Sequence, residues 1–178
     1  MKNRLLRYNF DSEFVFIDCE TFNLCLNSCH NLPWQIAMIK VKGKKIIDRK
    51  NFFIKWDTKL KISQDAARMT GYSEKNMKKN AVSPEEAFPT IHDWLENCDY
   101  ICGHNVLGFD IYLLRGLYKY FNKNYQPLVP KVIDTFAVAK GIKLNYKYDK
   151  NQDFTEYQYR VINTIKRGLK CSLGALGK

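Results

Sequence analysis

Apolar and polar positions along the chain follow a pattern that predicts an α/β fold. An unbroken apolar run at residues 14–17 indicates a central strand buried on both faces. Two more extended stretches, at 34–41 and 45–54, flank a Gly-containing turn and indicate a hairpin. Helical and extended patterns then alternate as far as residue 140, which is typical of a mixed sheet with crossover helices.

Local signals mark where the helices begin and end. Ser63 can cap a helix that Gly71 ends, and Ser83 followed by Pro84 predicts a helix that continues to about residue 97. Further elements are expected as a strand at 100–102, a helix beginning near 110, a strand at 129–134, and helices at 135–140 and 161–167. The pattern predicts one domain over residues 1–178, with a five-stranded mixed sheet flanked by helices.

The charge balance favours a polyanionic partner. The 178 residues include 29 basic and 18 acidic side chains, for a net charge of +11, and 46% are hydrophobic. A folded domain with this excess of positive charge is suited to nucleic acid, because each phosphate that it neutralises releases condensed counterions. A basic surface that merely reflects biased composition is the alternative.

The N-terminal residues give no indication of export or membrane insertion. They lack the apolar core of a signal peptide, and no run approaches the roughly 18 apolar residues of a membrane span. We therefore expect a cytoplasmic protein without a membrane partner, in which the six cysteines are reduced and mostly buried.

Three acidic residues stand where predicted strands and helices meet. Asp18 and Glu20 end the first apolar strand, and Asp110 begins a helix after the strand at 100–102. Side chains at i and i+2 of a strand point to the same side, so Asp18 and Glu20 can converge on one point. Clustered carboxylates repel one another unless a cation lies between them, and divalent metal ions are the candidates.

Residues 18–21 (Asp-Cys-Glu-Thr) resemble the first motif of the DnaQ-like (DEDD) 3′–5′ exonucleases, and residues 104–110 (His-Asn-Val-Leu-Gly-Phe-Asp) resemble their second motif. Supporting matches occur in the family's order at 35–36, 69–71 and 133–135. The resemblance extends from about Phe14 to the end of the chain. It implies an RNase H-like fold and a metal-dependent 3′–5′ exonuclease that removes nucleotides from single-stranded DNA 3′ ends in proofreading or repair, with a DNA polymerase as a candidate partner.

The resemblance also implies roles for individual residues. Asp18 would bridge two Mg²⁺ or Mn²⁺ ions, Glu20 would hold the ion next to the nucleophile, and Asp110 would serve the second ion. Ions about 4 Å apart around one phosphate can activate water and stabilise the leaving oxygen.

Four neighbouring residues are candidates for contacts with the substrate: Thr21, Phe22, Asn105 and Phe109. Each of the last three has an alternative role, because Phe22 and Phe109 can be core aromatics and Asn105 can form a turn. His104 matches the family's structural histidine, and Asp134 is expected to cap the following helix.

The family's third motif, a His-x4-Asp or Tyr-x3-Asp pattern, is absent. None of the three histidines or the late tyrosines is followed by an acid at these spacings. We therefore expect a domain that is incomplete at its C-terminal end and hydrolyses slowly, with residues 142–160 as a basic, Tyr-rich loop or insertion. The alternatives are a proofreading module of a longer or split DNA polymerase, a non-catalytic nucleic-acid-binding protein, and an RNA exonuclease.

Overall fold

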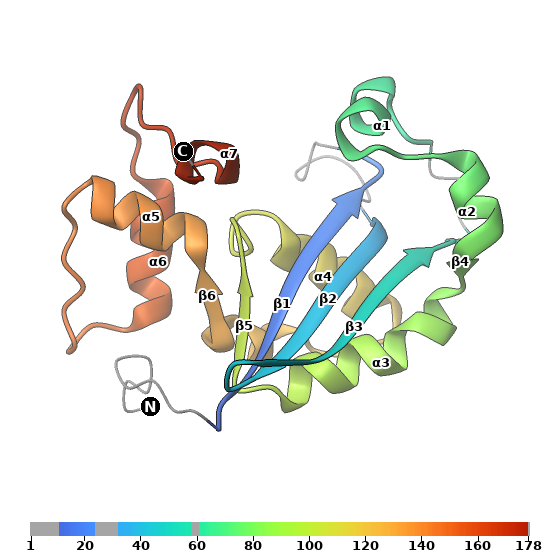
Figure 1. The fold of residues 1–178 in the computed structure, drawn as a ribbon, viewed down its shortest axis with the longest axis horizontal. Helices are drawn as coiled ribbons and strands as arrows, with labels where there is room; N and C mark the ends of the chain where they lie inside the picture. Colours follow the sequence, from blue (N-terminus) through green and yellow to red (C-terminus); the bar gives the residue numbers. More distant parts are fainter. Residues whose placement is uncertain (1–10, 24–31, 58–60, 178) are drawn as a thin grey trace.

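A six-stranded mixed sheet is the framework of the protein (Figure 1). The computed structural model describes residues 11–23, 32–57 and 61–177. The strands are β1 (Glu13–Thr21), β2 (Pro33–Lys42), β3 (Lys45–Ile54), β4 (Ala81–Val82), β5 (Tyr100–Gly103) and β6 (Val132–Asp134), in the order β4-β3-β2-β1-β5-β6. β2 is antiparallel to β1 and β3, whereas β4 is parallel to β3, and β1, β5 and β6 are parallel to one another. The α/β class is therefore confirmed, and β4 makes six strands instead of the predicted five.

Most helix ends follow the capping signals. The helices are α1 (Gln64–Thr70), α2 (Glu74–Asn80), α3 (Pro84–Asn97), α4 (Asp110–Tyr120), α5 (Thr135–Lys143), α6 (Phe154–Asn163) and α7 (Leu173–Leu176), with a 3₁₀ helix at Gln126–Lys131. The Ser63 side chain accepts a hydrogen bond from the Ala66 N–H, and Gly71 ends α1 with a φ of 67°. The Ser83 hydroxyl likewise accepts from the Glu86 N–H at the start of α3. No helix among the described residues is long and apolar enough to cross a membrane.

The core lies between one face of the sheet and helices α3 and α4, which are behind the sheet in Figure 1. Val15, Ile17 and Cys19 of β1 are buried on this face. Phe16 points to the other face and is 43% exposed. The prediction that this strand is buried on both faces is therefore wrong, because α3 and α4 both pack against the face that carries Val15 and Ile17.

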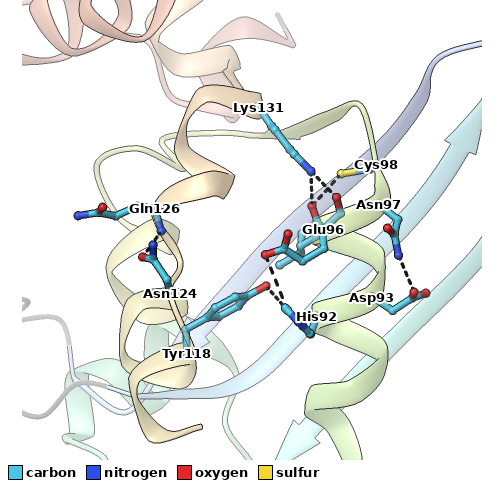
Figure 2. A network of polar contacts seen from close by, with 10 residues as sticks. His92, Asp93, Glu96, Asn97, Cys98, Tyr118, Asn124, Gln126 and Lys131 are labelled. Carbon is cyan, nitrogen blue, oxygen red and sulfur yellow. Dashed lines mark hydrogen bonds and ion pairs between the residues drawn. The ribbon is translucent and has the colours of Figure 1, made fainter. Parts of the chain in front are cut away.

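A polar network joins α3, α4 and the 3₁₀ helix at the back of the sheet (Figure 2). The His92 Nδ1 lies 3.2 Å from the Tyr118 hydroxyl and 3.9 Å from the Glu96 carboxylate. The Lys131 ammonium donates to the carbonyl oxygens of Leu95 and Glu96, near the end of α3. These donors satisfy carbonyls that have no partner within the helix, and the cation is favourable at a helix C-terminus.

Two predicted elements differ from the structure. The strand expected at 129–134 is a 3₁₀ helix up to Lys131 and a strand only from Val132, because Pro127 and Pro130 have no N–H to donate to a sheet. The helix expected at 161–167 is α6, which begins at Phe154 because the Asp153 carboxylate caps it through the Glu156 N–H. Residues 154–160 of the predicted loop are therefore helical.

The four cysteines that the structure describes, Cys19, Cys98, Cys102 and Cys171, are buried and free, as predicted. The sequence pattern did not indicate α2 or β4. Both are short, and β4 consists of two residues, each of which pairs with β3.

Candidate active site

The first two acids stand on the face of β1 that α3 and α4 leave uncovered. Strand alternation buries Cys19 at 3% exposure and turns Asp18 and Glu20 to the opposite side. Asp18 lies across from Ala37 of β2, and Glu20 lies across from Gln35. The small Ala37 side chain leaves Asp18 accessible. The register with β2 shifts directly after Glu20, and such irregularities are common beside active sites.

The third acid reaches β1 from a different part of the chain. Asp110 is the first residue of α4 and is 3% exposed. Its Oδ1 accepts a hydrogen bond of 2.8 Å from the N–H of Cys19, the residue between Asp18 and Glu20. The structure therefore brings together all three acids that the sequence singled out, at the carboxyl end of β1.

A tight turn between β5 and α4 makes this approach possible. A Cβ at Gly103 would lie 2.6 Å from the carbonyl oxygen of Ile17 and would collide with Val106, so only glycine fits beside β1 here. Asn105 adopts a φ of 68°, which fits its alternative role as a turn former. Its side-chain amide fills the space that a Cβ at Gly108 would need.

The Asp134 carboxylate fixes the position of this turn through hydrogen bonds to its backbone. It caps α5, as predicted, by accepting from the N–H groups of Phe136 (2.9 Å) and Ala137 (3.4 Å). It also accepts from the N–H groups of Asn105 (2.9 Å) and Leu107 (3.0 Å) and is fully buried. The sequence did not indicate this second role, because the N–H groups of the turn that need an acceptor can be identified only in the folded structure.

Gln158 of α6 fixes the backbone that carries Asp134. Its amide oxygen accepts from the Asp134 N–H at 2.7 Å, and its amide nitrogen donates to the Val132 carbonyl at 2.9 Å. Gln158 is fully buried, and both of its bonds go to the outer edge of β6. The sequence offered no direct signal for this residue beyond a polar side chain at a helical position that faces the sheet.

His104 has the structural position that the resemblance implied. Thr135 Oγ1 donates to the Gly103 carbonyl at 2.9 Å and lies 3.0 Å from His104 Nδ1. Because the threonine hydroxyl has one proton, it accepts from His104, whose Nδ1 therefore carries a hydrogen. Among the described residues, the buried Nε2 of His104 has no hydrogen-bond partner.

The four candidates for substrate contacts are divided between the core and the turn. Thr21 is fully buried, with its hydroxyl 3.2 Å from the Asn23 carbonyl. Phe22 is 8% exposed in the core, beside the Tyr72 ring, which favours its alternative role as a core aromatic. Asn105 and Phe109 are half-buried at the turn that precedes Asp110. Contacts of these residues with a substrate stay a prediction.

The three carboxyl groups influence one another electrostatically. Burial, and then the charge of Asp18, raises the pKa of Asp110 to about 7. The same two causes raise the pKa of Glu20, and partial burial raises the pKa of Asp18. The buried thiol of Cys19 is also held neutral, because burial and the charge of Asp110 raise its pKa.

This donor set fits a hard divalent cation. Carboxylate oxygens are the ligands that Mg²⁺ and Mn²⁺ prefer, and a cation would offset the charge of Asp18, which adds to burial in raising the pKa of Glu20 and Asp110. Among the described residues, no three His, Cys, Asp or Glu side chains are close enough to enclose a metal ion. The structure therefore brings the three acids together at the carboxyl end of β1 without enclosing a metal site among the described residues.

Comparison with known proteins decides the family. A family model described as Exonuclease (RNase T) matches residues 15–163, which include all three acids and the turn before Asp110. The chain belongs to the exonuclease family. Exonucleases of this kind depend on divalent metal ions.

Curated relatives of this exonuclease domain include DNA polymerases. The chain is 27% identical over 129 residues to the PolC-type DNA polymerase III of Mycoplasma pneumoniae, covering 72% of the chain and 8% of that protein. It is 26% identical over 165 residues to the PolC-type polymerase of Caldanaerobacter subterraneus subsp. tengcongensis, covering 89% of the chain and 11% of that protein. The chain thus spans about a tenth of the length of these relatives.

Solved structures confirm the fold. The exonuclease domain superposes on E. coli Exonuclease I, crystallised with a dT13 oligonucleotide, with a TM-score of 0.66 and 19% identity. The match covers 75% of this chain and 30% of that one. The DnaQ-like resemblance and the RNase H-like mixed sheet flanked by helices are therefore confirmed.

Replacing Asp134 should destabilise the exonuclease domain far more than replacing another helix cap. Asp134→Ala would leave buried N–H groups of the turn and of α5 without an acceptor, so we expect a loss of about 3 kcal/mol or more in the free energy of unfolding. Asp153→Ala, which removes the exposed cap of α6, is the matched control and should cost about 1 kcal/mol. Urea denaturation measures both values, and equal losses would contradict the proposed second role of Asp134.

The stability of the metal-free domain should fall as the pH rises from about 4 to about 8. The pKa of Asp110 is about 7 in the folded protein and about 3.9 in an unfolded chain. Between these values the folded state binds more protons, so raising the pH favours unfolding.

Asp110→Asn keeps an oxygen acceptor for the Cys19 N–H and should remove much of this pH dependence. Asp65→Asn, at an exposed position on α1, should leave it unchanged. Urea midpoints across the pH series provide the measurement. If the urea midpoint changed with pH by the same amount in the wild type and in Asp110→Asn, the Asp110 carboxyl group would not be the cause of the pH dependence of stability.

Proposed function

We propose that this exonuclease domain removes nucleotides from the 3′ ends of single-stranded DNA in a reaction that requires Mg²⁺ or Mn²⁺. The observation that carries the proposal is the meeting of Asp18, Glu20 and Asp110 at the end of β1, joined through the Cys19 N–H. A metal-dependent phosphodiester hydrolase needs hard oxygen ligands for its ions beside an open face of the protein.

Asp18, Glu20 and Asp110 would hold the metal ions. Asp18 is close enough to raise the pKa of both other acids, so it would share in binding the ions with Glu20 and with Asp110. A bound pair of divalent ions supplies activation of water and neutralisation of phosphate charge. The chain's own part is to hold the ligands: Cys19 fixes the Asp110 carboxylate, and the turn at Asn105 sets where α4 begins.

Charge and similarity support DNA as the substrate. The net charge of +11 favours a polyanion, Exonuclease I was crystallised with a DNA oligonucleotide, and the curated relatives are DNA polymerases. We also propose that these 178 residues alone hydrolyse slowly, because they contain three of the family's acids and no third motif. An RNA strand of the same sequence tests the alternative substrate, since discrimination depends on the 2′-hydroxyl.

A single-stranded DNA labelled at its 5′ end should be shortened slowly from its 3′ end when Mg²⁺ or Mn²⁺ is present. Asp18→Asn should reduce the rate by at least about 100-fold, because it removes one charge that binds metal. Asp48→Asn, which changes an exposed acid on β3 paired with Lys50, should leave the rate unchanged. Gel analysis of the products gives direction and rate.

Two results of this assay would contradict the proposal in different ways. Shortening that persists in a chelator, or equally in Asp18→Asn, would exclude the acidic site as the catalyst. Fast degradation that Asp18→Ala abolishes would confirm the activity and overturn only the expected slow rate.

A second candidate is a proofreading module that works with a DNA polymerase, as the PolC-type relatives suggest. In that case, adding the replicative polymerase of the same cell should speed the removal of a mispaired primer terminus by at least about tenfold, because bound polymerase raises the effective concentration of the terminus. The measurement compares primer shortening with and without the polymerase. An unchanged rate would count against the second candidate.

A further inference from the structure

A basic pocket lies where the end of α5 meets α6. Its volume is about 330 Å³, and it is lined by Asn145, Tyr146, Lys147 and Arg160. The first three residues follow the end of α5, and Arg160 is on α6. In Figure 1 these two helices lie beyond β6, at the opposite edge of the sheet from β3.

The two cations in the pocket have no acidic partner among the described residues. Arg160 donates to the Gln152 amide oxygen at 3.1 Å, and its guanidinium carbon lies 5.7 Å from the centre of the Tyr157 ring. Within the part of the chain that the structure describes, neither Lys147 nor Arg160 forms an ion pair, and both are exposed. Two uncompensated positive charges beside one cavity are suited to a phosphate group.

The aromatic ring at the pocket is presented from a fixed backbone. The Tyr146 N–H donates to the Gly141 carbonyl at 2.9 Å, and the Tyr146 carbonyl accepts from the Tyr157 hydroxyl at 2.8 Å. The Tyr146 side chain is nevertheless 40% exposed. An exposed ring on a fixed backbone can stack on a nucleobase with little loss of conformational entropy.

The neighbouring tyrosines have other roles. Tyr157 is 6% exposed, and the Tyr148 ring packs edge-on against the rings of Phe154 and Tyr157. The basic, Tyr-rich segment that the sequence singled out is therefore divided: some of its rings hold α6 in place, and Tyr146 remains available beside Lys147 and Arg160.

We propose that this pocket is a second contact for single-stranded nucleic acid, in which Lys147 and Arg160 bind a backbone phosphate and Tyr146 stacks on a base. The proposal rests on the proposed function for its ligand. Neighbouring strands are about 4.8 Å apart, so β1 and β6 are roughly 10 Å apart, and the pocket lies beyond β6. It therefore contacts nucleotides several positions upstream of the 3′ terminus, and only a longer strand can reach both sites.

The test compares the binding of fluorescent DNA strands of about 4 and about 16 nucleotides. These lengths bracket the site sizes of single domains that bind single-stranded DNA. The double variant Lys147→Ala/Arg160→Ala should weaken binding of the long strand only. Its slope of log K against log salt should also become shallower by about 0.7, the value for the loss of one phosphate contact on a single strand. Tyr146→Ala should weaken binding of the long strand by about tenfold, whereas Tyr146→Phe should preserve it.

Matched controls separate this pocket from general charge effects. Lys119→Ala/Lys123→Ala removes two exposed cations near the C-terminal end of α4, away from Asp110, and should leave the salt slope almost unchanged. Arg160→Lys keeps the charge and should keep the slope. Because every pocket position is on the surface, thermal unfolding should show that all variants remain folded.

Binding is measured in a chelator and shortening is measured with metal, so the two proposals can fail independently. Equal losses for both strand lengths, or equal changes in the Lys119→Ala/Lys123→Ala control, would overturn the pocket proposal. The pocket proposal would also be overturned if a nucleoside monophosphate bound to the pocket and the affinity for DNA did not depend on strand length. Absence of metal-dependent shortening would overturn the exonuclease function and leave the length-dependent binding result standing.

Discussion

The buried carboxylate of Asp134 is the interaction on which the acidic site depends. It accepts hydrogen bonds from two backbone segments, the turn before α4 and the first turn of α5. The turn sets the start of α4, and the start of α4 sets Asp110 against Cys19. A carboxyl group outside the cluster of three acids thus determines where Asp110 lies relative to β1. Its burial is tolerated because backbone donors surround it.

Elements of the fold could be predicted from the sequence where helix-capping residues or apolar runs give a clear local signal. Ser83 and Pro84 begin α3 as capping preferences require, and the apolar run of β1 marked the central strand. Prediction from the sequence failed where tertiary contacts determine burial or strand pairing. Whether Phe16 is buried depends on which face the helices cover, and β4 exists only because two residues happen to reach the edge of β3.

For the site, the sequence indicated the acids but not what holds them. Asp18, Glu20 and Asp110 could be singled out because strand spacing and motif order are properties of the chain itself. The hydrogen bond from Cys19 to Asp110 spans 91 positions, and that from Asn105 to Asp134 spans 29. Such partners become neighbours only after folding. Phe22 shows the same limit, because its position after the motif fits a substrate contact and a core side chain equally well, whereas the structure buries it.

The shortness of β4 has a consequence for how the molecule can associate. β4 covers only Phe53 and Ile54 of β3, so in the described part of the chain most of the outer side of β3, away from β2, is left unpaired. The exposed stretch carries Lys45, Asp48, Arg49 and Lys50, charges that discourage the addition of another strand. At the opposite edge, the Gln158 amide occupies backbone groups of β6 that an incoming strand would need. Both borders of the sheet are thus protected against the edge-to-edge pairing that leads to aggregation, and contacts with other molecules are directed to its faces and loops.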